Sequence, residues 1–137
     1  MPKHVNDQLL RSFTYLSSSG SGTHSAWAPN TDVYEKAGSL VVRMELAGIK
    51  REDLEIMVTD RLLLVHGQRK DPCRQGRCSF RQVEIDYGYF ERRIVFPGAV
   101  DARHAKARLQ NGFLQIELPK TTQSEPMCVT VIIEHHD

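Results

Sequence analysis

The segment 107–120, ARLQNGFLQIELPK, constrains the fold of this chain more than any other stretch. Its Asn111 and Gly112 supply the two residues of positive φ that a type I′ hairpin turn requires. Beyond the turn, apolar residues alternate with more polar ones, as in a strand that buries one face. Pro119 then ends the pairing because it has no amide hydrogen to donate. We therefore expect an antiparallel hairpin that packs one face into a core.

The same alternation recurs upstream. SLVVRMEL (39–46) and LEIMV (54–58) place apolar residues on one face, whereas RLLLVHGQ (61–68) is apolar on both faces and should form a central strand covered twice. FRQVEIDY and YFERRIVF follow, and CVTVIIE comes later in the chain. About eight short strands separated by turn residues, with no convincing helix among them, predict an all-β antiparallel β-sandwich.

The composition changes along the chain and divides it into three zones. Residues 1–26 hold a small apolar group and a Ser/Gly-rich linker, SSSGSGTHS, and should form a flexible N-terminal arm. Residues 27–120 carry the strand pattern. Residues 121–137 form a C-terminal extension, in which the polar spacer TTQSEP precedes a short apolar segment. A chain of 137 residues is long enough for one such domain to bury a core without the help of disulfide bonds or metal ions.

Charge and hydropathy exclude several classes of protein. The formal net charge of +1, with no basic stripe, argues against a nucleic-acid partner. No run approaches the roughly 18 apolar residues of a membrane span, and the first residues lack the apolar region of a secretory signal. The sparse cysteines, Cys73, Cys78 and Cys128, suit free thiols in a reducing compartment. We expect a cytoplasmic protein with no membrane span.

The chain shows no set of residues that would carry out chemistry. None of its six histidines has a partner at metal-ligand spacing, and its cysteines form no C-x-x-C pair. It also lacks a phosphate-binding loop, a nucleophile elbow and a dinucleotide fingerprint. We therefore predict no enzymatic activity, no metal and no cofactor.

One basic residue breaks the apolar pattern. If Phe90 and Ile94 face the core, the alternation carries Arg92 to the same dry face, where an unpaired guanidinium is costly. Arg92 then needs a carboxylate from its own sheet or from a second chain, and Glu84 and Asp86 are the candidates. The alternative is that its head group reaches solvent at a sheet edge.

These features together resemble the α-crystallin domain of small heat-shock proteins of the bacterial and plant type. The resemblance is most specific at the hairpin, which matches the signature A-x-x-x-n-G-v-L, with Phe113 where a smaller residue is usual. It extends upstream through WAPNTDVYE, MELAGIKREDLEI, LLLVHGQRK and YGYFERRIVFP, and covers nearly all of 27–120. The signature residues are Ala107, Asn111, Gly112 and Leu114.

The resemblance implies an immunoglobulin-like sandwich and the function of an ATP-independent holdase chaperone, which binds partly unfolded client proteins and prevents their aggregation. It also implies a homodimer that assembles into a homo-oligomer. In this type of protein the loop at 69–88 carries a strand exchanged onto the partner's edge strand, here near 32–35. Arg92 matches a family arginine at the subunit interface, and the further residues that we expect there are Phe80, Glu84 and Asp86 of the loop.

The two flanking segments carry the remaining expectations. Val129 and Val131 correspond to the family's anchor, which docks on a neighbouring dimer, although this segment could also be the last strand of its own sandwich. The arm is short for the family, which favours a dimer or small oligomer. Its expected client contacts are Leu9, Leu10, Phe13, Tyr15 and Leu16.

Two other function classes stay open at this point. One is a monomeric adaptor of the related CS-domain kind, which would dock on a larger chaperone and have no use for a self-docking anchor. The other is an enzyme built on a β-sandwich, which the lack of a converging catalytic set disfavours.

Overall fold

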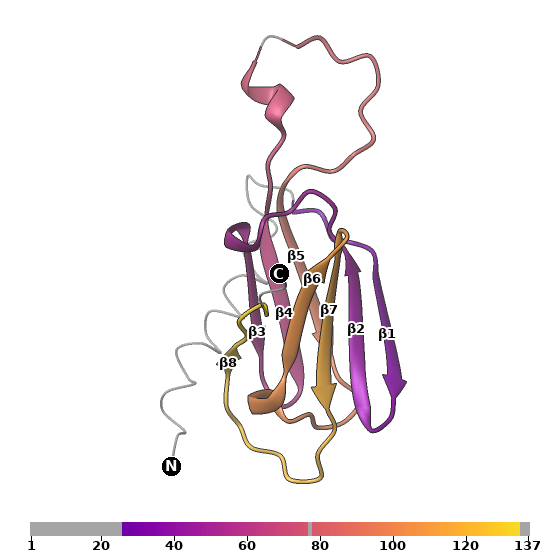
Figure 1. Cartoon of the computed structure of the whole chain (residues 1–137), viewed down its shortest axis with the longest axis vertical. Coiled ribbons are helices and arrows are strands. Elements are labelled where there is room, and N and C mark those ends of the chain that lie inside the picture. Colours follow the sequence, from indigo (N-terminus) through magenta and orange to yellow (C-terminus); the bar gives the residue numbers. More distant parts are fainter. Residues whose placement is uncertain (1–25, 77, 135–137) are drawn as a thin grey trace.

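The computed structural model describes residues 26–76 and 78–134, which form a sandwich of two four-stranded antiparallel sheets (Figure 1). The strands run in the orders β1-β2-β7-β6 and β5-β4-β3-β8. Their bounds are β1 Thr31–Lys36, β2 Ser39–Glu45, β3 Leu54–Val58, β4 Leu62–Arg69, β5 Gly88–Val95, β6 Lys106–Gln110, β7 Phe113–Pro119 and β8 Val129–Thr130. The predicted all-β antiparallel sandwich is confirmed.

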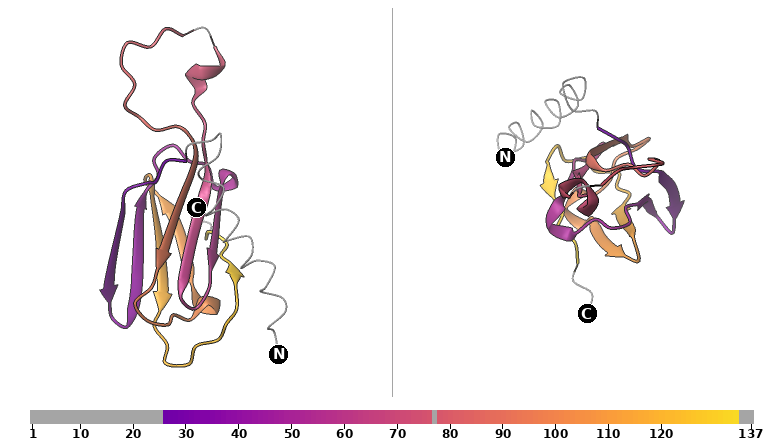
Figure 2. Two further views of the ribbon diagram at one scale, coloured as in Figure 1. Left: turned by 180° about the vertical axis from the view of Figure 1, so that it is seen from behind. Right: turned by 90° about the horizontal axis from the view of Figure 1, so that it is seen from above.

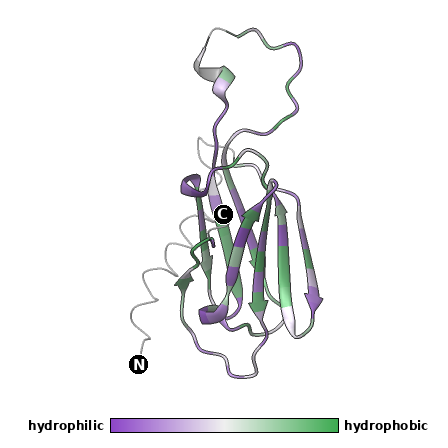
Figure 3. Cartoon of the chain, in the orientation of Figure 1, coloured by the Kyte–Doolittle hydropathy of each residue, from purple (hydrophilic) through white to green (hydrophobic). Residues whose placement is uncertain are grey.

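The core lies between the two sheets and is built from alternate residues of each strand. Val42 of β2 pairs with Ile116 of β7, and both residues are 0% exposed. In β2 the neighbouring Val41 is also apolar and is 4% exposed. On β7 the neighbours Gln115 and Glu117 are polar and face outward, so the colour bands of Figure 3 alternate along this strand. This period-two pattern is the one that a half-buried antiparallel strand requires.

Strand β4 is central and buried on both faces, as its sequence predicts. Leu63 and Val65 belong to the core between the sheets, whereas Leu64 points to the outer face. Leu64 is 0% exposed there because it packs with Met57 and Cys128 in a second, smaller apolar cluster. The sheet β5-β4-β3-β8 is therefore apolar on part of its outer face as well as on its inner one.

Two type I′-like turns set the register of the sheet β1-β2-β7-β6. Asn111 has φ 53° and Gly112 has φ 81°, which confirms the predicted turn between β6 and β7. The turn between β1 and β2 has the same pattern at Ala37, with φ 49°, and Gly38, with φ 81°. An alanine in this region of φ is unusual, so residues 37–38 carry no hairpin signal that sequence alone would reveal.

At Gly67 of β4, the residue before β3 and an aromatic ring of β5 pack closely against the backbone. A Cβ atom at this position would lie 2.1 Å from the backbone oxygen of Asp53 and 2.9 Å from Cζ of Phe90. Phe90 is the cross-strand partner of Gly67 and is 0% exposed. Only glycine allows the Phe90 ring and the Asp53 backbone to pack at this point.

The helices of the described residues are three short 3₁₀ turns, η3 Arg51–Asp53, η4 Pro72–Gln75 and η5 Ala102–His104. None of the described helices is long and apolar enough to cross a membrane. The predicted strand FRQVEIDY, at 80–87, does not form within this chain: these residues run as an irregular segment that pairs with no strand of the sandwich.

Candidate functional site

One side of the sandwich, formed by β1 and β5, is incompletely covered. We call this region the open edge; it comprises β1, which includes Val33, and the β5 residues Arg92 and Ile94. Val33 pairs with Val42 and faces the interior, yet it is 45% exposed, whereas Val42 is 0% exposed. Ile94 of β5 also faces the core and is only half-buried. The core therefore ends at this edge without a covering strand.

Arg92 faces the interior at the open edge, as the parity of β5 predicts. It pairs across the sheet with Val65, a residue of the main core, and is half-buried. Within the described ranges, no ion pair involves Arg92. Neither Glu84 nor Asp86 reaches it in the single chain. The pairing of Arg92 with a carboxylate of a second chain stays a prediction.

The connection between β4 and β5, residues 70–87, stands away from the sandwich, and we call it the projecting loop (Figures 1 and 2). Apolar side chains on it are exposed: Phe80 is 49% exposed, Val83 58% and Ile85 59%. Glu84 accepts a hydrogen bond from Gln82 on the same loop. A segment with this much exposed apolar surface is typical of a surface that binds another polypeptide.

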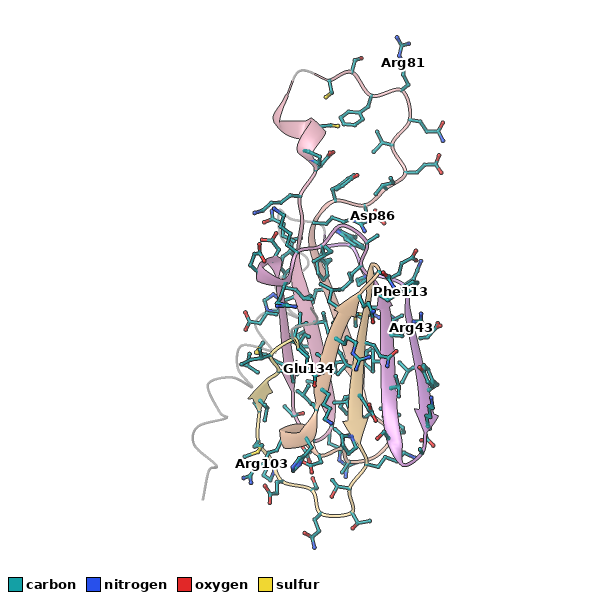
Figure 4. The ribbon with its side chains drawn as sticks, viewed as in Figure 1. Arg43, Arg81, Asp86, Arg103, Phe113 and Glu134 are labelled. Atoms are coloured by element: carbon teal, nitrogen blue, oxygen red, sulfur yellow. The ribbon has the colours of Figure 1, made fainter. Side chains whose placement is uncertain are left out.

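Arg69, the last residue of β4, fixes the base of the projecting loop. Its Nε and Nη2 donate to the backbone oxygen of Asp86, the first over 2.8 Å, and its Nη1 donates to the oxygen of Ala47 over 3.2 Å. The guanidinium also lies 4.3 Å from the ring centroid of Trp27 and 5.5 Å from that of Tyr87. Both ends of the loop are thereby held on the sandwich. Figure 4 shows Asp86 at the base and Arg81 pointing outward at the far end.

The opposite side of the sandwich is closed by residues 129–133, which we call the tail strand. It lies in the seam between β3 and β6 and bonds to both: the amide of Val131 donates to the oxygen of Ile56 over 2.9 Å. Further on, the amide of Glu134 donates to the oxygen of Ala107 over 2.9 Å, and Ile133 forms a parallel bridge with Ala107. Arg51 adds a hydrogen bond to the oxygen of Glu134.

Alternate side chains of the tail strand fill the seam. Val131 is 8% exposed and Ile133 is 6% exposed, and Val129 packs against the same core. Ile132 points the other way and is 83% exposed. In this structure the segment is thus a strand of its own sandwich, which is the alternative that the sequence left open. Docking of Val129 and Val131 on a neighbouring dimer stays a prediction.

The signature hairpin provides one wall of this seam. Ala107 is 1% exposed beneath Ile133, where its small side chain leaves room for the tail strand, and Leu114 is 0% exposed in the core. The departure from the family pattern, Phe113, is 38% exposed on the outer face, where the guanidinium of Arg43 lies 4.5 Å from its ring centroid (Figure 4). The larger side chain is therefore accommodated without entering the core.

Cys128 precedes the tail strand and is buried, with 8% exposure, against Met57 and Leu64. Burial raises the pKa of its thiol from 9.0 to about 11. The spacer before it is held by Arg103, which bonds to Glu125 over 3.3 Å. The extension thus makes both polar and apolar contacts with the sandwich.

Several features that matter here carry no strong sequence signal. Arg69 looks like an ordinary basic residue at a strand end, and Gly67 gives no sign of its close contacts. Ile133 is buried because it continues the alternate spacing of Val129 and Val131. The anchor expected from the sequence comprises only those two valines and does not include Ile133. The expected client contacts in the arm lie outside the described residues.

The described residues contain no group of three or more His, Cys, Asp or Glu side chains arranged to hold a metal ion. What the geometry offers is backbone and apolar surface: an open strand edge, an exposed apolar loop, and a seam filled by an extended segment. Features of this kind are typical of proteins that bind extended polypeptide segments.

Comparison with known proteins identifies the family. The model described as "Hsp20/alpha crystallin family" matches residues 32–133. Small heat shock protein C2 of Rickettsia felis is 27% identical over 93% of this chain and 82% of its own length. The 16.9 kDa class I heat shock protein 1 of Triticum aestivum is 30% identical over 85% of this chain and 79% of its own.

The fold agrees with a solved structure of the same family. Heat shock protein 16.0 from Schizosaccharomyces pombe superposes with a TM-score of 0.65 at 30% identity, covering 72% of this chain and 92% of that one. The chain belongs to the Hsp20/α-crystallin family, the small heat-shock proteins, as its resemblance implied. These are non-enzymatic chaperones, typically oligomeric.

Proposed function

We propose that this chain is an ATP-independent holdase, which binds partly unfolded proteins and prevents their aggregation. One observation carries the proposal: the seam between β3 and β6 accepts an extended apolar segment. It does so through backbone hydrogen bonds to Ile56 and Ala107 and through alternate apolar side chains. An unfolding protein displays segments of the same kind, with unpaired backbone groups and alternating apolar residues.

The chemistry of the seam explains why such binding needs neither sequence specificity nor nucleotide. Backbone groups are common to all clients, and burial of apolar surface contributes about 25 cal/mol per Å² whichever aliphatic residue is buried. Each contact is weak, and several contacts together hold a client. Because holding is an equilibrium between free and bound unfolded chain, no ATP is required.

The open edge and the projecting loop support a dimer formed by strand exchange. In an extended segment Val83 and Ile85 lie on one face and Glu84 and Asp86 on the other. Added beside β1 of a second chain, the segment would cover inward-facing Val33 with apolar side chains and satisfy the backbone of the edge strand. We include in this interface Phe80 of the loop and an ion pair of Arg92 with a carboxylate of the partner chain.

Assembly and client contact complete the proposal. The tail strand, with Val129 and Val131, would exchange from its own seam to that of a neighbouring dimer, where the same backbone and side-chain contacts are available. This links the dimers into an oligomer and opens a seam whenever a tail leaves. The arm supplies the further client contacts, Leu9, Leu10, Phe13, Tyr15 and Leu16.

The test is light scattering of a heat-aggregating model protein, with and without this chain, in the absence of nucleotide. Suppression at an equimolar subunit ratio is expected, and no suppression would refute the holdase assignment. Size-exclusion chromatography on the same sample separates the holdase from a CS-domain adaptor, since the adaptor is expected to run as a monomer.

A paired variant locates the client surface. Val131→Asp with Ile133→Asp should free the seam and increase suppression, whereas the matched control Ile132→Asp, at an 83% exposed position, should leave it unchanged. Circular dichroism verifies that each variant keeps its β-sheet spectrum. Folded tail variants that suppress no better than the control would show that clients bind elsewhere.

The dimer is tested separately by deleting residues 71–80. No residue of this stretch belongs to a strand of the sandwich, so the deletion should give folded monomers. A deletion variant that dimerises with unchanged affinity would contradict strand exchange.

A further inference from the structure

The outer end of the projecting loop brings together two of the three cysteines. Cys73 lies in η4 and Cys78 shortly after it, and both are exposed, whereas Cys128 is buried. The holdase mechanism uses neither thiol. Exposed cysteines that lie close together on a surface loop are the kind that react with other thiols and disulfides.

A folded turn holds the two cysteines together. The carboxylate of Asp71 accepts a hydrogen bond from the amide of Cys73 over 2.9 Å and begins the turn. The amide of Gly76 donates back to the oxygen of Cys73 over 3.2 Å, and the amide of Cys78 donates to the oxygen of Gly76 over 3.2 Å. These bonds hold the described residues 71–76 and Cys78 in a compact turn.

The turn places the thiol of Cys78 against the backbone of Cys73. The Sγ of Cys78 donates to the backbone oxygen of Cys73 over 3.0 Å. The pKa of the Cys73 thiol is raised, first by the charge of Cys78, then by that of Asp71, with further contributions from burial and from a side-chain hydrogen bond to Cys78. The sulfur of Cys78 thus lies within hydrogen-bond distance of the Cys73 backbone, and closing a disulfide requires only that the two Cβ atoms come to about 3.5–4.5 Å.

We propose that Cys73 and Cys78 form a redox-active dithiol site whose substrate class is a small disulfide such as oxidised glutathione. A thiolate of one cysteine attacks a sulfur of the small disulfide, and the S–S bond breaks to release one small thiol and leave a mixed disulfide on the protein. The second thiolate then attacks the protein sulfur of that mixed disulfide. The Cys73–Cys78 bond forms and a second small thiol leaves.

The balance of this reaction is complete. Two protein thiols lose two electrons and two protons, and one small disulfide gains them to become two thiols. The turn already places the cysteines side by side, so the second attack is intramolecular and should outpace any reaction between two protein molecules. The product would fix η4 next to the apolar segment that begins at Phe80.

Fixing this turn has a consequence for the dimer, which rests on the proposed strand exchange. The loop loses conformational freedom when it pairs with a partner, and a disulfide removes part of that freedom beforehand. If the disulfide removes as much conformational entropy as fixing the backbone of one residue does, the dissociation constant of the dimer falls about fivefold. We therefore expect the oxidised dimer to dissociate less readily than the reduced one.

The test equilibrates the full chain with reduced and oxidised glutathione at a series of ratios, quenches with acid, and counts free thiols by alkylation and intact mass. Two thiols should disappear together in the wild-type chain and in the control Cys128→Ser, at the mass of one chain with no glutathione attached. Cys73→Ser and Cys78→Ser should each retain glutathione on the remaining exposed cysteine.

Trypsin gives the position of the bond, because cleavage after Lys70, Arg74, Arg77 and Arg81 leaves DPCR joined to CSFR only when the disulfide is present. Stable glutathione adducts on the wild-type chain, or disulfide-linked dimers on a non-reducing gel, would overturn the proposal. So would three free thiols at every ratio. None of these outcomes depends on chaperone activity, and the fivefold effect on dissociation is measured separately by analytical ultracentrifugation.

Discussion

The tail strand leads to a prediction that separates folding within one chain from docking between chains. Ile133 and Ile132 are adjacent, yet Ile133 is 6% exposed in the seam and Ile132 is 83% exposed on the surface. Replacement of each by alanine removes the same atoms from opposite faces of one strand. The pair is therefore a matched test of whether the seam of the same chain holds the tail.

The magnitude follows from the burial. Ile133→Ala deletes three buried carbon groups, each worth about 0.8 kcal/mol, and leaves a space at an edge that neighbouring side chains can partly close. We expect the free energy of unfolding to fall by about 2–3 kcal/mol, which for a domain of this size corresponds to a Tm lower by roughly 8–15 °C. Ile132→Ala should change the free energy of unfolding by less than about 0.5 kcal/mol.

Thermal unfolding followed by circular dichroism measures both variants, and light scattering after size-exclusion chromatography gives their particle mass. The expected result is a lower Tm for Ile133→Ala, with Ile132→Ala like the wild type, because the seam of the same chain holds the tail whenever the tail is not exchanged to a neighbouring dimer. If Ile133→Ala instead kept its Tm and lost particle mass, the tail would be docked on neighbouring chains. Equal Tm and equal mass for both variants would refute the contacts themselves.

Three further predictions concern other parts of the sandwich. Arg92→Ala should weaken the dimer, because removal of one member of a buried ion pair costs about 3–5 kcal/mol; an unchanged sedimentation profile would support a guanidinium that only reaches solvent. Gly67→Ala should lower the free energy of unfolding in urea by about 1–3 kcal/mol or more, since its Cβ would lie 2.1 Å from the oxygen of Asp53; wild-type stability would show that the backbone moves apart at little cost. Cys128, whose pKa burial raises to about 11, should react with iodoacetamide more slowly than the exposed Cys73 at pH 8; equal rates in a timed mass-spectrometric assay would mean that the tail does not stay docked. Because the folded chain holds this proton more tightly than the unfolded chain, stability should also fall as pH rises above about 9.

The strands could be predicted where a local pattern decides the structure. The turn at Asn111 and Gly112, the double burial of β4 and the inward parity of Arg92 all follow from residues close in sequence. The turn at Ala37 could not be predicted in this way, because alanine tolerates positive φ poorly and the pairing of β1 with β2 imposes it.

The candidate site was less predictable because its parts depend on distant contacts. The segment at 80–87 has the composition of a strand, yet it pairs with no strand of its own chain in the described structure. The tail strand was recognisable as an apolar extended segment, while the choice between its own seam and a neighbour's depends on the geometry of Ile56 and Ala107. The role of Arg69 carries no local signal, because its four contacts come from residues far apart in the sequence.

The arrangement around Arg69 makes the projecting loop a separable module. Its two ends are anchored to the sandwich through contacts that involve Ala47 and Trp27, so the path of the chain between those ends is not constrained by the core. Insertions, deletions or wholly different sequences between Lys70 and Ile85 should leave the sandwich intact while they change which chains it recognises. Partner choice can thus diverge among related chains without any change to the fold, and a loop transplanted between two of them should carry its pairing preference along.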